Sequence, residues 1–375
     1  MQHLTTVLPA CLAALLCACT NAQPEDAHAD PKRQPAPAGD APPTPAVGEV
    51  VRELGDGLWI IFQDRQGTTW FGTDGDGLYR VDGNRILRFT TKDGLCSDRV
   101  RQILEDTSGN LYFNTLGGIS TFDGQRFRTL VPVQAGSALS AWSSQPGDLW
   151  FQGNQDDNGP YRYDGRTLHH HEFPKHELEP AFLAIAPHAP FSPYQVYTIF
   201  HDSRGALWFG TSTFGVCRYD GRSLTWISED ELTELDGGPS FGVRGIVEDQ
   251  DGQFWFSNLL HRYDVSASEP KEPGAPSAAY RRTRGLVDSE ARMDAAPAYF
   301  MSGLKDGHGV LWFATLDAGV WRYDGNHVTR FPVQDRGQAV RLYSIYEDKG
   351  GTLWLGTTGQ GAYRFDGTAF ARFRP

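Results

Sequence analysis

Residues 201–228 read HDSRGALWFGTSTFGVCRYDGRSLTWIS, and versions of this phrase occur seven times along the 375-residue chain. Each copy places an aromatic residue just after its first turn, at spacings of 38 to 58 residues: Trp70, Tyr112, Trp150, Trp208, Trp255, Trp312 and Trp354. A period of this size is typical of folds in which each copy is one supersecondary unit. Every copy contains four short segments of strand character, separated by Gly, Asp and Asn residues that favour turns.

The second copy shows the expected order of the strands. Its four predicted strands are VRQILED, LYFNT, ISTFDG and RFRTL, and Asp123-Gly124 joins the last two. Asp-Gly favours a type I′ hairpin turn, because both central residues of that turn need positive φ. An Asp recurs at this corner in all seven copies: Asp82, Asp123, Asp164, Asp220, Asp264, Asp324 and Asp366. Four-stranded units at this period predict an all-β fold, a seven-bladed β-propeller of four-stranded antiparallel blades over residues 49–375.

The Trp and Phe of LWFG point to alternate faces of the second strand of each blade, called strand B here, so each blade presents aromatic rings to both neighbours. We therefore expect the tryptophans to be core residues. Each of the seven blades can come from one continuous stretch between Leu58 and Phe373. An alternative closure leaves VVREL at 50–54 as an added strand at the outer edge of the seventh blade.

The repeated pattern resembles a known family. The order D.xG.LWFGT..GL.RYDG...F.RF, with the connector FTTKDGLCSDRV at 89–100, is similar to the two-component regulator propeller repeat. The resemblance implies a periplasmic sensor domain of the kind found in bacterial hybrid histidine kinases, many of which detect oligosaccharides. The sequence shows no transmembrane helix, kinase or β-sandwich after the propeller, so signalling is not assigned to this chain alone.

The N-terminus predicts export and a lipid anchor. The apolar run from Val7 to Ala18 is too short to span a bilayer and is typical of a secretory signal, here residues 1–18. Its end, Leu16-Cys17-Ala18-Cys19, resembles the lipobox of bacterial lipoproteins, which implies cleavage before Cys19 and diacylation of its thiol. The alternative is an ordinary cleaved signal peptide. Because Thr20 is not the Asp of the inner-membrane retention signal, the outer membrane is the expected location.

Residues 19–48 are rich in Pro and Ala and contain almost no large apolar side chains, which predicts a disordered tether. The net charge of −12 argues against nucleic acid or an anionic lipid surface as the main partner. Within the propeller only Cys96 and Cys217 remain, two blades apart, so we expect two unpaired thiols.

The sequence carries no nucleophile elbow, HExxH or phosphate loop, and we predict no catalytic residue, cofactor or metal site. Asp74-Gly75-Asp76 and EDQDG at 248–252 hint at calcium loops but lack a full set of alternating ligands. The HHH run at 169–171 places His169 and His171 on one face of a strand, where a weak metal site is the less favoured interpretation.

Loop lengths indicate which face of the propeller carries function. The corners between the first and second strands are short in all copies, whereas the connections between blades vary and include 174–194, 228–242, 284–298 and 332–341. The loops between the second and third strands vary too, 153–160 being the longest, and they share a face with the inter-blade connections. Variable loops on a rigid scaffold often carry binding. The alternative is that long surface loops are simply tolerated.

One position near the start of the innermost strand, called strand A here, sharpens this expectation. Its occupants in the seven copies are Trp59, Arg101, Leu139, Tyr197, Arg244, Met301 and Tyr343. A dry core rarely contains arginine, and the propeller symmetry directs this position toward the central axis. We therefore predict that one pocket at the channel entrance is lined by Trp59, Arg101, Tyr197, Arg244 and Tyr343. The alternative is that the arginines pack between blades against carboxylates.

Aromatic faces pair with the C–H faces of sugars, and Arg donates paired hydrogen bonds to hydroxyls or carboxylates. The leading hypothesis is a non-catalytic envelope lipoprotein that binds an extracellular glycan. One alternative is a scaffold that docks another envelope or signalling protein. Another is a propeller lyase or hydrolase, with Tyr197 or Tyr343 as a base beside Arg244.

Overall fold

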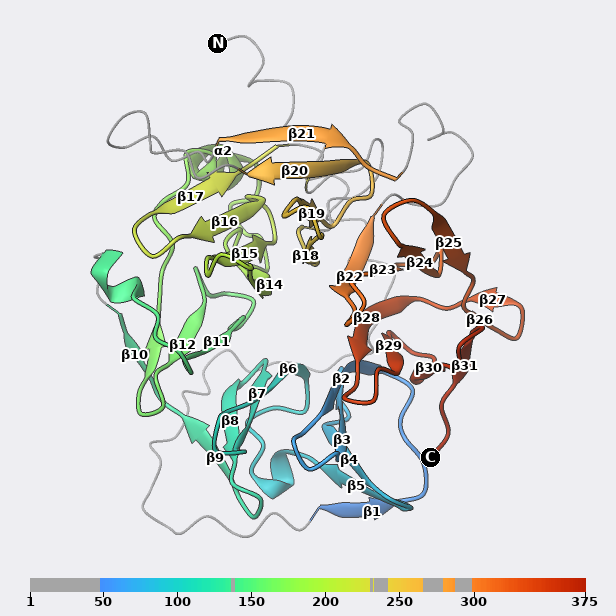
Figure 1. The fold of residues 1–375 in the computed structure, drawn as a ribbon. Coiled ribbons are helices and arrows are strands. Elements are labelled where there is room, and N and C mark those ends of the chain that lie inside the picture. Colours follow the sequence, from blue (N-terminus) through green and yellow to red (C-terminus); the bar gives the residue numbers. More distant parts are fainter. Residues whose placement is uncertain (1–47, 136–138, 230–231, 233–241, 266–278, 287–298) are drawn as a thin grey trace.

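A computed structural model of the protein describes residues 48–135, 139–229, 232, 242–265, 279–286 and 299–375. Seven small sheets are arranged in a ring, which confirms the predicted β-propeller (Figure 1). The predicted signal peptide and nearly all of the predicted tether lie outside the described residues, as do most of the connections 228–242 and 284–298.

The first three blades follow one another along the chain. Blade 1 contains β2 (Leu58–Gln63), β3 (Thr69–Thr73), β4 (Leu78–Asp82) and β5 (Arg85–Phe89), with β1 (Glu49–Val51) added outside β5. Blade 2 contains β6 (Val100–Glu105), β7 (Leu111–Thr115), β8 (Gly118–Phe122) and β9 (Phe127–Leu130). Blade 3 contains β11 (Leu149–Phe151), β12 (Tyr161–Tyr163) and β13 (Leu168–His170), with β10 (Pro132–Gln134) outside β13.

The other four blades are antiparallel sheets in chain order. Blade 4 contains β14 (Val196–His201), β15 (Leu207–Thr211), β16 (Val216–Tyr219) and β17 (Leu224–Ile227). Blade 5 contains β18 (Ile246–Glu248), β19 (Phe254–Phe256), β20 (His261–Val265) and β21 (Tyr280–Arg284). Blade 6 contains β22 (Phe300–Lys305), β23 (Leu311–Thr315), β24 (Val320–Tyr323) and β25 (Val328–Phe331). Blade 7 contains β28 (Leu342–Glu347), β29 (Leu353–Thr357), β30 (Tyr363–Phe365) and β31 (Phe370–Arg372).

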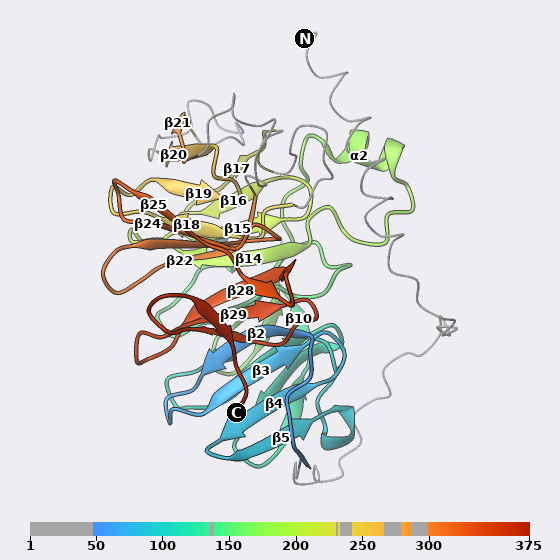
Figure 2. The same cartoon turned by 90° about the vertical axis from the view of Figure 1, so that its right-hand side faces the viewer.

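Short elements decorate the connections. The 3₁₀ turn η1 (Thr91–Asp93) follows blade 1, and the hairpin of β26 (Gln334–Asp335) and β27 (Gln338–Ala339) joins blades 6 and 7. The helix α2 (Glu179–Ile185) interrupts the long connection between blades 3 and 4. Seen from the side, α2 projects from one face of the ring (Figure 2). In the described part of the chain, no helix is both long and apolar enough to cross a membrane.

Blade 3 departs from the prediction. Residues 139–142, expected as its innermost strand, form the 3₁₀ turn η2 (Leu139–Trp142). The reason is the burial of Trp142, which is 2% exposed. The centroid of its ring lies 6.1 Å from that of Trp150 and 5.9 Å from that of Phe209. A 3₁₀ turn that buries an indole ring therefore replaces the expected innermost strand. The fourth strand of this blade is β10, which runs parallel to β13 at the outer edge.

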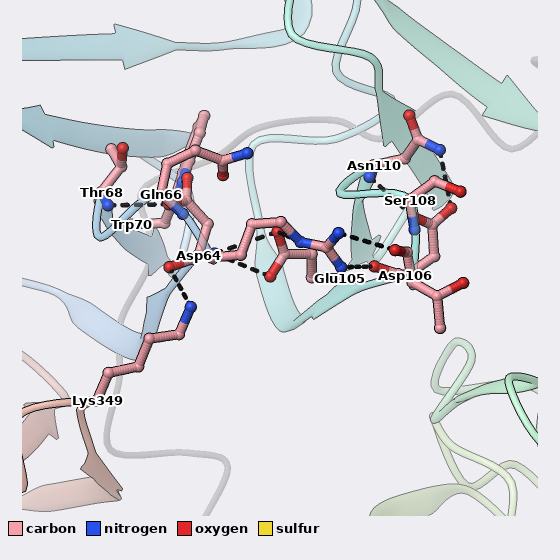
Figure 3. A network of polar contacts seen from close by, with 11 residues as sticks. Asp64, Gln66, Thr68, Trp70, Glu105, Asp106, Ser108, Asn110 and Lys349 are labelled. Carbon is pink, nitrogen blue, oxygen red and sulfur yellow. Dashed lines mark hydrogen bonds and ion pairs between the residues drawn. The ribbon is translucent and has the colours of Figure 1, made fainter.

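The repeated phrase encodes a fixed environment for the tryptophan of strand B. In blade 4, Asp202 Oδ1 accepts from the backbone N–H groups of Arg204 and Ala206, and Oδ2 accepts from Trp208 Nε1 at 2.8 Å. The same arrangement joins Asp64 to Trp70 (Figure 3) and, with a tyrosine hydroxyl as the donor, Asp106 to Tyr112. The first corner of each blade is thereby tied to its second strand.

The arginine of the RYDG motif covers the other side of this tryptophan. In five blades the guanidinium carbon lies 5.5–5.9 Å from the centroid of an indole ring, in the pairs Arg80–Trp70, Arg218–Trp208, Arg262–Trp255, Arg322–Trp312 and Arg364–Trp354. A cation over an indole face is a favourable contact. The Trp, Arg and Asp of the phrase therefore recur together because they form one structural unit, as the prediction of core tryptophans requires.

Small residues on strand B let the next blade approach closely. A Cβ atom at Gly72 would lie 2.8 Å from the side chain of Val100 in blade 2, and one at Gly356 would collide with the carbonyl oxygen of Trp59. The contact of blade 7 with blade 1 thus repeats the contact of blade 1 with blade 2. Ser344 Oγ also donates to the Trp59 carbonyl at 2.5 Å, and Lys349 Nζ donates to the Asp64 carbonyl at 2.8 Å (Figure 3).

The ring closes without a shared strand between its first and last blades. All four strands of blade 7 come from residues 342–372. The segment expected at the outer edge of blade 7 instead pairs with blade 1, where β1 runs antiparallel to β5 from Glu49 to Val51, so that placement was wrong. The ion pair of Arg88 with Glu49, at 2.9 Å, favours this partner. Cys96 and Cys217 are free, which confirms the expectation of two unpaired thiols.

Candidate functional site

A β-bulge marks the start of the innermost strand in five blades. In each, the ladder with strand B skips one residue, at the second position of strand A. The skipped residues are Trp59, Arg101, Tyr197, Met301 and Tyr343. A bulge frees a residue from regular pairing and redirects its side chain. Five of the seven positions aligned in the sequence are therefore bulge positions, on the strands β2, β6, β14, β22 and β28 that surround the centre of the ring in Figure 1.

In blade 5 the equivalent residue, Arg244, is positioned by hydrogen bonds and not by a bulge. Its strand β18 begins only at Ile246, and Ser257 Oγ accepts from the backbone N–H groups of Arg244 and Gly245 at 2.7 and 2.8 Å. Ser257 has a φ of 49°, a conformation that few non-glycine residues adopt. The chain before β18 is thus held to the residue that follows β19 by the Ser257 side chain, together with a backbone hydrogen bond from Ser257 N–H to the Gly245 carbonyl at 2.9 Å.

Aromatic and cationic groups from different blades meet at this level. The rings of Trp59 and Tyr343 stack with centroids 4.4 Å apart and planes inclined by 15°. The guanidinium carbon of Arg244 lies 3.9 Å from the centroid of the Tyr197 ring. Burial would lower the pKa of Arg244, but the electrostatic effect of Tyr197, Tyr299 and Tyr343 outweighs it and raises that pKa. Two pairs thus hold four of the five predicted residues, and the electrostatic influence of Tyr343 and Tyr299 on Arg244 links the pairs; these four residues and Tyr299 are called the axial cluster.

Tyr299 is the member that the repeat alignment missed. It lies two residues before the aligned Met301, is 3% exposed, and donates its hydroxyl proton to the carbonyl oxygen of Gly242 at 2.8 Å. Burial raises the pKa of this phenol. An alignment of one position per blade contains no signal for a residue from the preceding loop. Tyr299 pairs in an isolated bridge with Asn258, two residues after β19, and this pairing places it near the cluster.

Arg101 is placed differently from the other four predicted residues. Burial is the main cause that raises the pKa of Asp74, while the charges of Arg99 and Arg101 oppose this rise. Arg99 Nε pairs with Asp74 at 2.9 Å. Among the described residues, no ring contact, hydrogen bond or ion pair joins Arg101 to the axial cluster. Arg101 thus has a carboxylate neighbour, as the alternative of packing between blades expects.

Two donor groups near the axis have no partner in the described part of the structure. They are Trp59 Nε1 and Arg101 Nε, and both atoms are buried. A buried N–H group that lacks an acceptor costs about 1–3 kcal/mol. A ligand that supplied an acceptor at either position would remove that cost.

The other motifs singled out in the sequence have structural roles. Asp74 pairs with Arg99, and Asp76 accepts from Arg88 at 2.8 Å, so cations already occupy both carboxylates of the Asp-Gly-Asp segment. Glu248 accepts from the backbone N–H and the hydroxyl of Ser203, both at 2.7 Å.

The histidine run is not an exposed pair. His169 Nε2 lies 2.9 Å from Asp164 Oδ2, but His171 is 1% exposed and packs its ring against Trp142 and Trp150. His171 therefore belongs to the core between blades 3 and 4.

Comparison with solved structures finds other propellers. A streptogramin B lyase is 15% identical with a TM-score of 0.57, over 83% of this chain and 95% of that one. A catalytically inactive virginiamycin B lyase from Staphylococcus aureus with quinupristin is 16% identical with a TM-score of 0.56, over 84% of this chain and 98% of that one. Identities this low show a shared fold alone.

The extracellular domain assigned to a one component system of B. thetaiotaomicron is 17% identical over 88% of this chain and 53% of that one. Its TM-score of 0.40 is too low to support an argument. No curated protein matches the chain. The family model described as the two component regulator propeller matches residues 190–213 and 337–359. Each of these segments begins in a connection between blades and continues through strands A and B of the next blade. The chain is thus a seven-bladed β-propeller in which two segments match the two component regulator propeller model.

Proposed function

We propose that this protein is a non-catalytic, envelope-anchored binding propeller that captures a saccharide at the axial cluster, in sensing or uptake. The observation that carries the proposal is the convergence of the stacked Trp59–Tyr343 pair and the Arg244–Tyr197 pair from blades 1, 7, 5 and 4. The bulges in the innermost strands support it, because bulges are frequent beside functional sites. The two component regulator propeller repeats support a sensing role.

The chemistry of the cluster favours a sugar that carries a carboxylate. Aromatic side chains give a flat apolar surface for the C–H face of a pyranose, and they lose little conformational entropy on binding. Arg244 is a permanent cation at this place, and a guanidinium donates paired hydrogen bonds to a carboxylate. The unpartnered N–H group of Trp59 adds a donor for a ring hydroxyl. A uronic acid satisfies all three requirements.

The location follows from the N-terminal sequence. Processing before Cys19 and acylation of its thiol would hold the propeller at the membrane surface, with residues 20–48 as the tether. Labelling of cells with a radioactive fatty acid should mark the wild-type protein but not the Cys19→Ser variant. Unlabelled wild-type protein released into the periplasm would contradict the anchor while leaving the binding proposal open to its own test.

A glycan array that contains uronic oligosaccharides tests the axial site. Arg244→Ala should weaken a carboxylated glycan by about 1.5–3 kcal/mol, since its hydrogen bonds are charge-assisted. Trp59→Ala should weaken neutral and acidic glycans alike at this site. Arg222→Ala, at an exposed corner turn of the opposite face, is the matched control. Unchanged glycan binding in both axial variants, with a lowered melting temperature, would show that these residues only pack the blades.

A polysaccharide lyase is the second candidate, and the position of Arg244 beside Tyr197 and Tyr343 favours it. A lyase needs a base near the proton to be removed and a cation that stabilises the resulting charge. Solved lyases share this fold at TM-scores of 0.55 to 0.57. Incubation with uronic acid polymers, followed by ultraviolet absorbance of unsaturated products, separates a lyase from a binding protein.

A further inference from the structure

A cavity lies at the seam between blades 1 and 7, and it shares no residue with the axial cluster. It has a volume of about 620 Å³ and is lined by Val51 of β1 and Glu53–Asp56 before β2, by Asp335 and Arg336 of the β26–β27 hairpin, and by Gly359, Gln360 and Arg372 of blade 7, together with Tyr79 and Arg88. Small-molecule sites usually measure about 300–1,000 Å³, so this seam cavity has the size of a ligand site.

Ion pairs engage two arginines that line the seam cavity, Arg372 of blade 7 and Arg88 of blade 1. Arg372 pairs with Asp56 at 2.7 Å and with Asp335 at 3.5 Å. Arg88 pairs with Asp76 at 2.8 Å and with Glu49 at 2.9 Å. The pair of Arg372 with Asp56 links the last strand of the chain to the segment before β2, and the pair of Arg88 with Glu49 links β5 to β1. Their structural role is sufficient to explain them.

Three groups in the wall of the cavity have no such role. Within the described ranges, the side chains of Glu53 and Arg336 make no hydrogen bond or ion pair, and the Gln360 Oε1 atom is buried without a donor. The Arg88 Nε atom is likewise buried without an acceptor. The seam cavity therefore presents a carboxylate, a guanidinium, an unused acceptor and an unused donor.

Arg336 has a left-handed backbone conformation, which is unfavourable for a residue with a long side chain. Arg336 has a φ of 51° and Gly337 a φ of 79°, as the two central residues of a two-residue hairpin. The first of these positions normally holds Asn, Asp or Gly, since a long side chain adopts left-handed φ at a cost. Arginine is the costlier choice for the turn, and what it adds there is a guanidinium at the edge of the cavity.

We propose that the seam cavity is a binding site for a neutral saccharide unit. The formal charges of its lining cancel, with Arg88, Arg336 and Arg372 against Glu53, Asp56 and Asp335, so the cavity does not select a charged ligand. Sugar hydroxyls both donate and accept, and a guanidinium opposite a carboxylate can hold such groups from two sides. Leu54 and Val51 supply apolar surface for the C–H groups of the ring. The proposal does not depend on the axial site, because the two share no residue.

The test compares full-length wild-type protein with Arg336→Asn, Glu53→Gln and Trp59→Ala on an array of neutral and uronic oligosaccharides. The strongest neutral glycan is then titrated by calorimetry. Arg336→Asn and Glu53→Gln should each weaken it about tenfold, the effect of losing one hydrogen bond to a charged group. Asn suits the type I′ turn, so the melting temperature of that variant should not fall. Arg222→Asn, on the opposite face, should bind like the wild type.

The outcomes separate this site from the axial one. A neutral glycan whose affinity falls in both seam variants and persists in Trp59→Ala supports the seam site. If only Trp59→Ala loses the binding of neutral glycans, or if both seam variants bind them as the wild type does, the proposal of a seam site is wrong. The axial proposal is then unaffected. The absence of any neutral glycan that binds wild-type protein overturns it as well. Loss of uronic acid binding alone in the seam variants would also contradict it, because the ligand would then be an acid.

Discussion

Trp59 and Tyr343 stack face to face, with ring centroids 4.4 Å apart, although they belong to the first and the last blade of the propeller. Both are bulge residues at the second position of an innermost strand. The backbone at the same place is held by the hydrogen bond from Ser344 to the Trp59 carbonyl. The contact that closes the ring therefore also forms part of the axial cluster, so ring closure and the proposed ligand site share the same two rings.

This relationship predicts energetic coupling across the closure. Trp59→Ala and Tyr343→Ala should each lower the free energy of unfolding, and the double variant should lose less than the sum of the two. A coupling of about 0.5–1.5 kcal/mol is expected for a stacked aromatic pair. Urea unfolding of the four proteins measures it. Strict additivity would contradict an energetic role for the stack.

The first corner of each blade gives a second prediction. Asp202 accepts three hydrogen bonds, from two backbone N–H groups and from Trp208, whereas Ser144 in blade 3 accepts one, from Trp150 at 3.2 Å. Asp202→Ala should therefore lower the free energy of unfolding by about 3 kcal/mol and Ser144→Ala by about 1 kcal/mol. Chemical denaturation of both variants makes the comparison. Equal losses would show that the carboxylate is not a major anchor of the corner.

The repeated sequence predicted the fold well because each copy contains a complete local unit. The Trp of strand B contacts both the Asp of the first corner and the Arg of the third strand of the same blade, so their pattern can be recognised without knowledge of the rest of the chain. Blade 3 was mispredicted at residues 139–142 because the alignment of copies assumed a strand there. The burial of Trp142 depends on Phe209 of the next blade, which no local pattern reveals.

The candidate site was predictable only in part. Register placed Trp59, Tyr197, Arg244 and Tyr343 at one level of the ring, because equivalent strand positions in a propeller face the same axis. Register carries no information on Tyr299, which comes from a connection between blades, or on the electrostatic interaction of Arg101 with Asp74 of the neighbouring blade. The seam cavity was not predicted either, since it combines an inter-blade hairpin, the segment before β2 and the last strand.

The two cysteines should differ in reactivity. Cys217 lies in the core between blades 3 and 4 with no exposed surface, and burial raises the pKa of its thiol well above its ordinary value. Because the thiolate is the reactive form, Cys217 should resist iodoacetamide in the folded protein and react once the protein is unfolded in urea. Cys96 is partly exposed and should be modified first. Peptide mass spectrometry distinguishes the two sites, and early modification of Cys217 would contradict its burial.

The histidine run makes stability depend on pH. His171 is 1% exposed, and neither ring nitrogen has a hydrogen-bond partner in the described structure. Burial, followed by the positive charge of Arg162, lowers the pKa of His171 to about 3, from 6.5 as an ordinary value. Between these two pH values the unfolded chain binds a proton that the folded protein does not bind. The free energy of unfolding should therefore be unaffected by this group above about pH 6.5 and should fall as the pH drops from there toward 3.

Replacement of His171 by Phe should remove this dependence, because Phe fits beside the rings of Trp142 and Trp150 and takes up no proton. The melting temperature of His171→Phe should exceed that of the wild type by more at pH 5 than at pH 7.5. His176, stacked on Phe214 with its pKa also lowered by burial, should leave a smaller residual dependence in the variant. His308→Phe, at an exposed corner turn, serves as the control. Calorimetric scans across this range check the prediction, and a difference that does not change with pH would mean that His171 is not the group that titrates.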